Sequence, residues 1–196
     1  AMDTALLNVP QIDGQVVVCP DVSGSMITAV TGQRGSATSS VRCIDAAALV
    51  AAALLRRNRL ARVLPFEQEV VKLDLNPRDS VMSNAKALAA IGGGGTNCSA
   101  PLALLNHEQA KVDLVVIVSD NESWVDATRR GATQTMHEWE LLKRRNPNAR
   151  LVCIDLQPGH TTQALERDDI LNVGGFSDAV FEMIARFTQA RLDPDH

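Results

Sequence analysis

The sequence is poor in aromatic residues, which make up 3% of its 196 residues and include no tyrosine. A hydrophobic core must therefore be built mainly from Ala, Val, Leu and Ile, and apolar residues reach 45% of the chain, as in globular domains. Few aromatic rings leave little for stacking on single-stranded bases. The net charge of −4 also lacks the excess of Lys and Arg that a nucleic-acid-binding domain usually carries. Both features disfavour direct RNA binding by this chain.

Cysteine pairs and long apolar runs are absent as well. Cys19, Cys43, Cys98 and Cys153 form no Cys-x-x-Cys pair, which argues against a structural zinc site. Free thiols within apolar runs indicate a reducing, cytoplasmic setting. No signal peptide and no apolar run of about 18 residues is present, so we expect no membrane partner.

Apolar runs of strand length alternate with helical patterns along the chain. Strands are predicted at 15–20, 61–66, 69–75, 112–118, 150–156 and 170–174. Helices are predicted from Ser39 or Ser40 to about 59, from Asp79 or Ser80 to about 90, after Ser99, at 132–145 and at 177–191. Residues 27–38 are interpreted as an exposed loop, and 61–66 with 69–75 as an antiparallel hairpin. This order predicts an α/β fold with a doubly wound, mostly parallel six-stranded sheet, one antiparallel edge strand and helices on both faces.

The chain is predicted to hold one domain, over residues 14–191. Residues 1–13 form a lead-in, and residues 192–196 form a tail. Ala1 before Met2 is interpreted as a cloning remnant, so we expect the sequence to be a fragment of a longer protein.

Three stretches with oxygen-bearing side chains lie at the ends of predicted strands or in a loop between predicted helices. The first is Asp21-Val22-Ser23-Gly24-Ser25, the second is the glycine run 92–95 followed by Thr96, and the third ends an apolar strand at Asp120. Each alone is typical of a turn or a helix cap. In a doubly wound sheet, however, ligands bind beyond the carboxyl ends of the strands, where strand order reverses. Their convergence there predicts one divalent-metal site made of Asp21, Ser23, Ser25, Thr96 and Asp120.

These donors are all oxygens, the ligands that small hard cations prefer. Mg²⁺ is the expected ion, with Mn²⁺ or Ca²⁺ as alternatives, and either direct or water-mediated binding by the carboxylates is compatible with the sequence. An acidic group of a protein partner could complete such a coordination sphere. No His, Lys or Cys in the motif could serve as a general base, so we expect a binding module and no enzyme.

A Mg²⁺-dependent phosphohydrolase with Asp21 as nucleophile is the alternative enzyme. Such chemistry would want a second carboxylate two residues later, where the chain has Ser23, and a lysine in the motif loops. The glycine run lacks the Lys-Ser/Thr of a phosphate-binding loop. His137-Glu138 lacks the second histidine of a zinc protease, because position 141 is Leu.

The same residues resemble a known family. Asp21-x-Ser23-x-Ser25, Thr96 and Asp120 resemble the metal-ion-dependent adhesion site (MIDAS) of von Willebrand factor A (vWA) domains, over about residues 14–190. Gly-Gly-Thr96-Asn97-Cys98-Ser99-x-Pro101 and Ser119-Asp120-Asn121-Glu122-Ser123 are similar to the A domain of the Ro ribonucleoprotein (TROVE) family. Cys19-Pro20-Asp21-Val22-Ser23-Gly24-Ser25-Met26 resembles its bacterial branch.

The resemblance implies a Rossmann-like vWA fold and a role within a ribonucleoprotein. In that family a ring of helical repeats binds noncoding Y RNA and the A domain closes the ring. No helical-repeat region is present in this sequence. The resemblance therefore implies that this chain recognises an acidic protein group through the metal, while the missing ring binds RNA. Direct RNA binding by the chain is kept as an alternative. Glu122 and Trp124 are further candidates for the ligand-facing side.

Overall fold

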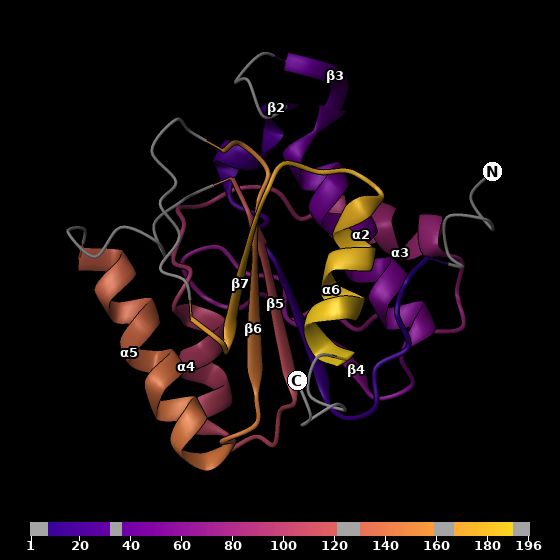
Figure 1. Ribbon diagram of the computed structural model, residues 1–196. Helices are drawn as coiled ribbons and strands as arrows, with labels where there is room; N and C mark the ends of the chain where they lie inside the picture. The colour runs from indigo at the N-terminus through magenta and orange to yellow at the C-terminus, as the bar shows by residue number, and fades with distance from the viewer. Residues whose placement is uncertain (1–7, 32–36, 121–129, 159–166, 190–196) are drawn as a thin grey trace.

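The computed structural model describes residues 8–31, 37–120, 130–158 and 167–189. Its centre is a parallel sheet with strand order β4-β1-β5-β6-β7 (Figure 1). The strands are β1 (Val16–Pro20), β4 (Ala61–Val63), β5 (Leu114–Ser119), β6 (Arg150–Asp155) and β7 (Ile170–Gly174). Every residue of β1 and β5 is buried. Such continuous burial is expected of central parallel strands, because helices cover both of their faces.

Helices pack on both faces of the sheet and create two separate cores. One face is covered by α2 (Cys43–Arg57), α3 (Val81–Ala89) and α6 (Ala179–Gln189), and the other by α4 (Ala100–His107) and α5 (Arg130–Arg145) (Figure 1). Along β1, Val16 and Val18 join the first core, whereas Val17 and Cys19 join the second. Because side chains alternate across a strand, each central strand serves both cores. The predicted doubly wound α/β class is confirmed.

Local signals set the boundaries of several helices. The Ser80 hydroxyl accepts a hydrogen bond from the Ser83 amide at 3.1 Å and caps α3, as predicted. Pro101 lies in the first turn of α4, where its missing N–H costs no helical hydrogen bond. These sequence signals act within a few residues, so the sequence alone was enough to predict them.

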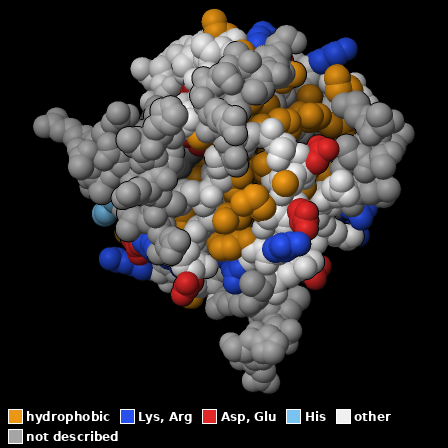
Figure 2. Space-filling model, turned by 45° about the horizontal axis from the view of Figure 1, so that its top comes forward, with side chains coloured by type: hydrophobic (Ala, Val, Ile, Leu, Met, Phe, Trp, Pro, Cys, Tyr) orange, Lys and Arg blue, Asp and Glu red, His pale blue; other side chains and the backbone are white. Residues whose placement is uncertain are grey.

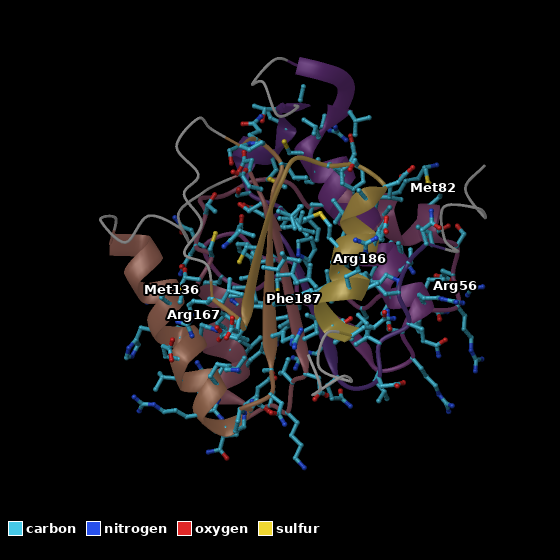
Figure 3. All side chains as sticks on the ribbon, in the orientation of Figure 1. Arg56, Met82, Met136, Arg167, Arg186 and Phe187 are labelled. Carbon is cyan, nitrogen blue, oxygen red and sulfur yellow. The ribbon has the colours of Figure 1, made fainter. Side chains whose placement is uncertain are left out.

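Polar and cation–π contacts link α5 and α6 to β6 and to the residues just before β7. The Trp139 indole of α5 is fully buried and its N–H donates to the Asp169 carboxylate at 2.9 Å. Arg167 lies beside α5 (Figure 3) and binds Asp169 at 2.9 Å and Glu140 at 2.5 Å. On the opposite face, the Phe187 ring of α6 lies 4.8 Å from the Arg150 guanidinium carbon. These contacts tie α5 and α6 to the strands.

The predicted hairpin of residues 61–66 and 69–75 differs from the structure. The chain does turn at Glu67, whose amide donates to the Glu69 carbonyl, and Val71 donates to the Pro65 carbonyl. Beyond that point residues 71–76 form no strand, so the described sheet has five strands, all parallel, and no antiparallel edge strand. Val71, Leu73 and Leu75 instead pack against the α2–α3 core. Their alternation reflects this packing.

The predicted loop at 27–38 and helix start at Ser39 or Ser40 are wrong. A 3-10 turn, η1 (Gly24–Ile27), leads into an antiparallel pair, β2 (Ala29–Thr31) and β3 (Ala37–Arg42). Ser39 and Ser40 lie in β3, and α2 begins at Cys43. The Cys43 amide donates to the Thr28 carbonyl at 2.8 Å. The carbonyl of Thr28 therefore accepts a hydrogen bond from the first amide of α2, a role that was predicted for a serine hydroxyl next to the helix.

The described part of the lead-in packs against the domain. Val9 is buried in the α2 core, and the Ile12 amide donates to the Asn58 side chain at 2.7 Å.

Figure 2 shows hydrophobic side chains gathered in the middle of one face, with a few acidic and basic side chains beside them. None of the described helices combines the length and apolar character needed to cross a membrane.

Candidate metal centre

The candidate site lies where the strand order reverses. From β1 the chain runs first to β4 on one side, and later to β5 on the other side of β1. β1 and β5 are parallel neighbours, and the Asp21 amide just beyond β1 donates to the Val118 carbonyl at 2.8 Å. Asp120 follows β5 directly. The two predicted acids therefore leave adjacent strand ends, at the position where open α/β sheets bind ligands.

Asp21 is fully buried, with 0% of its surface exposed. One carboxylate oxygen accepts the Ser23 amide at 2.8 Å, and the other accepts the Ser119 hydroxyl at 2.6 Å. Ser119 was not among the predicted site residues. It was quoted only as part of the family-like stretch 119–123, with no role at the site. These two donors hold the Asp21 carboxylate in one orientation.

A chain of hydroxyl contacts joins the remaining predicted residues. The Thr96 hydroxyl donates to Ser23 Oγ at 2.8 Å, and Ser23 Oγ lies 3.3 Å from Ser25 Oγ. The Ser25 hydroxyl in turn donates to the Asp120 carboxylate at 3.1 Å. The structure thus brings all five predicted residues together through side-chain or backbone hydrogen bonds. Glu122 and Trp124 lie outside the described residues.

The glycine run brings Thr96 to the first loop by close backbone approach. The Gly24 amide donates to the Gly94 carbonyl at 3.1 Å, and the Gly93 amide donates to the Val22 carbonyl at 3.2 Å. Gly94 has φ +74°, and a Cβ there would lie 1.7 Å from a carboxylate oxygen of Glu67. Only glycine adopts this conformation without strain and leaves room for Glu67. Gly94 is therefore required by the conformation of the loop that leads to Thr96.

Burial controls the electrostatics of the two acids. Burial raises the pKa of Asp21 above its usual value, although hydrogen bonds from Ser119 and Ser23 partly oppose this, and the charge of Asp120 adds to it. Burial likewise raises the pKa of Asp120, against the hydrogen bond from Ser25. The ionised carboxylates are thus held at a cost, which a nearby cation would offset.

The donor set fits a hard divalent cation. Within the described residues, no three His, Cys, Asp or Glu side chains cluster in a way that could hold a metal ion. A site here would therefore combine two carboxylates with hydroxyl oxygens. The Ser25 hydroxyl donates its hydrogen bond to Asp120 and accepts one from Ser23, so one of its two lone pairs remains available to a cation. Oxygen-only ligands with few carboxylates are suited to Mg²⁺, which usually keeps several waters.

Comparisons with known proteins agree on one family. A family model described as the Ro60 vWA domain matches residues 15–188. The chain is 27% identical over 194 residues to RNA-binding protein RO60 of Deinococcus radiodurans, covering 98% of this chain and 35% of that protein. It is 21% identical over 194 residues to RNA-binding protein RO60 of Caenorhabditis elegans, covering 96% and 28%.

A solved structure supports the same assignment. The crystal structure of the Deinococcus radiodurans RO (RSR) protein matches with a TM-score of 0.71 and 25% identity, over 94% of this chain and 36% of that chain. The chain thus spans about a third of the length of the relatives it matches.

Proposed function

This chain belongs to the Ro60 vWA domain family, and we propose that it is a metal-dependent binding module. A divalent cation, Mg²⁺ in the first instance, is held by Asp21, Ser23, Ser25, Thr96 and Asp120. The bound cation supplies a positive charge with an open coordination position. An acidic side chain of a protein partner takes that position. The chain's own residues orient the ligands and leave one side of the site open to the partner.

The observation that carries this proposal is the hydrogen-bond path from Thr96 through Ser23 and Ser25 to Asp120. Three segments far apart in the sequence contribute to it, and no single turn or helix cap would need all three. Ser25 is exposed and Asp120 is half-buried, whereas Asp21 and Ser23 are buried. The path therefore reaches the surface at Ser25, where a partner could reach the cation.

Catalysis is not part of the proposal. A phosphohydrolase with Asp21 as nucleophile needs a carboxylate at the position of Ser23, and the Asp21 carboxylate is buried and held by Ser119. The relatives are named for RNA binding rather than for a reaction.

RNA contact is assigned to a different part of the longer protein. The relatives are named RNA-binding proteins, and this chain corresponds to about a third of their length. We place the domain in a Ro-like ribonucleoprotein in which a helical-repeat ring binds noncoding Y RNA. The net charge of −4 supports this division of roles. The four cysteines are buried and form no disulfide, which supports a cytoplasmic setting.

Titration calorimetry with MnCl₂ and MgCl₂ tests the metal site on the chain as it stands. The wild-type chain should bind one cation, and Asp21→Asn should bind it far more weakly. Asp113→Asn is the matched control, because Asp113 also accepts a backbone amide, from Gln15 at 2.7 Å, at the opposite end of the sheet. Equal binding by wild type and Asp21→Asn would refute the assignment.

The partner chemistry needs a separate probe. With Mn²⁺ bound, a short peptide containing one Glu should displace metal-bound water and reduce the proton relaxation enhancement. The same peptide with Gln should leave it unchanged. Tight binding of noncoding RNA by the isolated chain in a gel shift would instead favour direct RNA recognition.

A further inference from the structure

The η1 turn that carries Ser25 depends on contacts made outside the turn. η1 has four residues, and only Met26 among them is buried. At its ends the backbone donates from Gly24 to the Gly94 carbonyl at 3.1 Å, from Met26 to the Ser23 carbonyl at 3.1 Å and from Thr28 to the Ser25 carbonyl at 3.2 Å. A single 3-10 turn is a weak element by itself. The position of the Ser25 hydroxyl must therefore be set by neighbouring elements.

One neighbour is the end of β6, through the side chain of Gln157. The Gln157 amide nitrogen donates to the Thr28 hydroxyl at 2.8 Å and to the Ala29 carbonyl at 2.9 Å. The Thr28 hydroxyl in turn donates a hydrogen bond to the Ser25 carbonyl at 2.9 Å. Gln157 thus reaches Ser25 through one intermediate hydroxyl. The contact joins residues 129 positions apart in the chain.

Gln157 is itself held firmly. Its backbone amide donates to the Asp155 carboxylate at 2.9 Å, and Asp155 is the last residue of β6. The Asp155 carbonyl accepts the Gly175 amide at 2.7 Å, just after β7. The backbone of Gln157 is therefore anchored at the carboxyl end of β6, and its side chain extends from there to the η1 turn.

We propose that Gln157 is a positioning residue for the metal site. Besides the backbone bond from Gly24 to the Gly94 carbonyl, the η1 turn is held by Asp120 on the Ser25 hydroxyl and by Gln157, through Thr28, on the Ser25 carbonyl. Gln157 touches neither the cation nor the partner. It sets the orientation of Ser25, and so the affinity for the cation. This inference rests on the proposed metal-binding function.

The discriminating variant is Gln157→Met, which keeps the length of the side chain and removes both donated hydrogen bonds. Partners that orient metal ligands typically change metal affinity about 10–100-fold when they are replaced. Calorimetry should therefore show Mn²⁺ binding weakened about 10–100-fold. Gln157→Glu keeps the shape but cannot donate, so it should fail to restore affinity. Gln15→Met, an exposed Gln→Met change at the opposite end of β1, should bind Mn²⁺ like the wild type.

Hydrogen exchange on the metal-free chain gives a readout that is independent of metal. Gln157→Met should accelerate exchange of the Met26 and Thr28 amides while α3 and α6 exchange at wild-type rates. Acceleration throughout the domain would overturn the proposal, because it would mean general destabilisation. Wild-type Mn²⁺ affinity in Gln157→Met would also overturn it and leave the proposed function standing. Failure of the wild type to bind Mn²⁺ would overturn both.

Discussion

Replacing Asp21 by Asn should invert the order of stability between variant and wild type when metal is added. Asp21 is fully buried, and burial raises the pKa of its carboxyl group above the usual value. The ionised form is therefore less favourable in the folded protein than in the unfolded chain. Asn keeps the shape and can still accept the Ser23 amide. Without metal at pH 7, Asp21→Asn should accordingly be more stable than the wild type.

Metal reverses this order because only the folded wild type binds it tightly. A cation at 100 times its dissociation constant stabilises the fold by about 2.7 kcal/mol. For a chain of this size that corresponds to a rise in Tm of roughly 5–10 °C. The variant should gain much less. Loss of charge-assisted hydrogen bonds costs about 1.5–3 kcal/mol each. The raised pKa indicates that the burial penalty of the charge is larger than the benefit of those bonds.

Thermal unfolding followed by circular dichroism, in EDTA and in excess MgCl₂, measures both effects. A carboxyl group whose pKa is raised by folding lowers stability as pH increases through the interval between its unfolded and folded pKa values. The advantage of metal-free Asp21→Asn should therefore be smallest at acidic pH and should grow with pH. A metal-induced rise in Tm equal to that of the wild type would refute the reasoning, as would a variant less stable than the wild type in EDTA.

Four further changes test other parts of the structure. Gly94→Ala should destabilise the fold by about 1–2 kcal/mol in urea unfolding, because its φ of +74° is left-handed, and an unchanged midpoint would contradict this. Thr96→Ala should cost about 1 kcal/mol of stability but weaken Mn²⁺ binding in calorimetry to a larger extent; equal losses in both would make Thr96 purely structural. Trp139→Phe should cost about 1–3 kcal/mol by removing the donor to Asp169. Burial alone would raise the pKa of Asp169, but hydrogen bonds led by that from Arg167 leave it below its usual value. The stabilising contribution of Asp169 should therefore be lost as pH falls through that lowered pKa, and a stability difference between Asp169→Asn and wild type that does not shrink towards acidic pH would contradict it.

The five predicted site residues could be chosen from the sequence because their residue types carry the chemistry. Asp21, Ser23 and Ser25 alternate within one short loop, and Thr96 and Asp120 each end a recognisable pattern. The residues that orient them gave no comparable signal. Ser119 matters because β1 and β5 are neighbours, and Gln157 because β6 ends beside the η1 turn. Ser119 belongs to a stretch quoted for the family resemblance and Gln157 to none, and only spatial proximity shows what either residue does at the site.

The sequence alone was sufficient for the five strands of the main sheet, the five helices that cover it, the aliphatic core and the cap at Ser80. Periodicity of two or 3.6 residues records which side of an element is buried, and a cap such as Ser80 acts within one turn. The tertiary structure decided which strands pair. Val71, Leu73 and Leu75 alternate like a strand but pack on α2 and α3, while residues 37–42 pair with 29–31 where a loop was predicted. Burial patterns do not specify which strands pair by hydrogen bonds, because either helices or strands can cover an apolar face. Partners follow from the arrangement of the whole sheet, which also brings the three oxygen-bearing segments together.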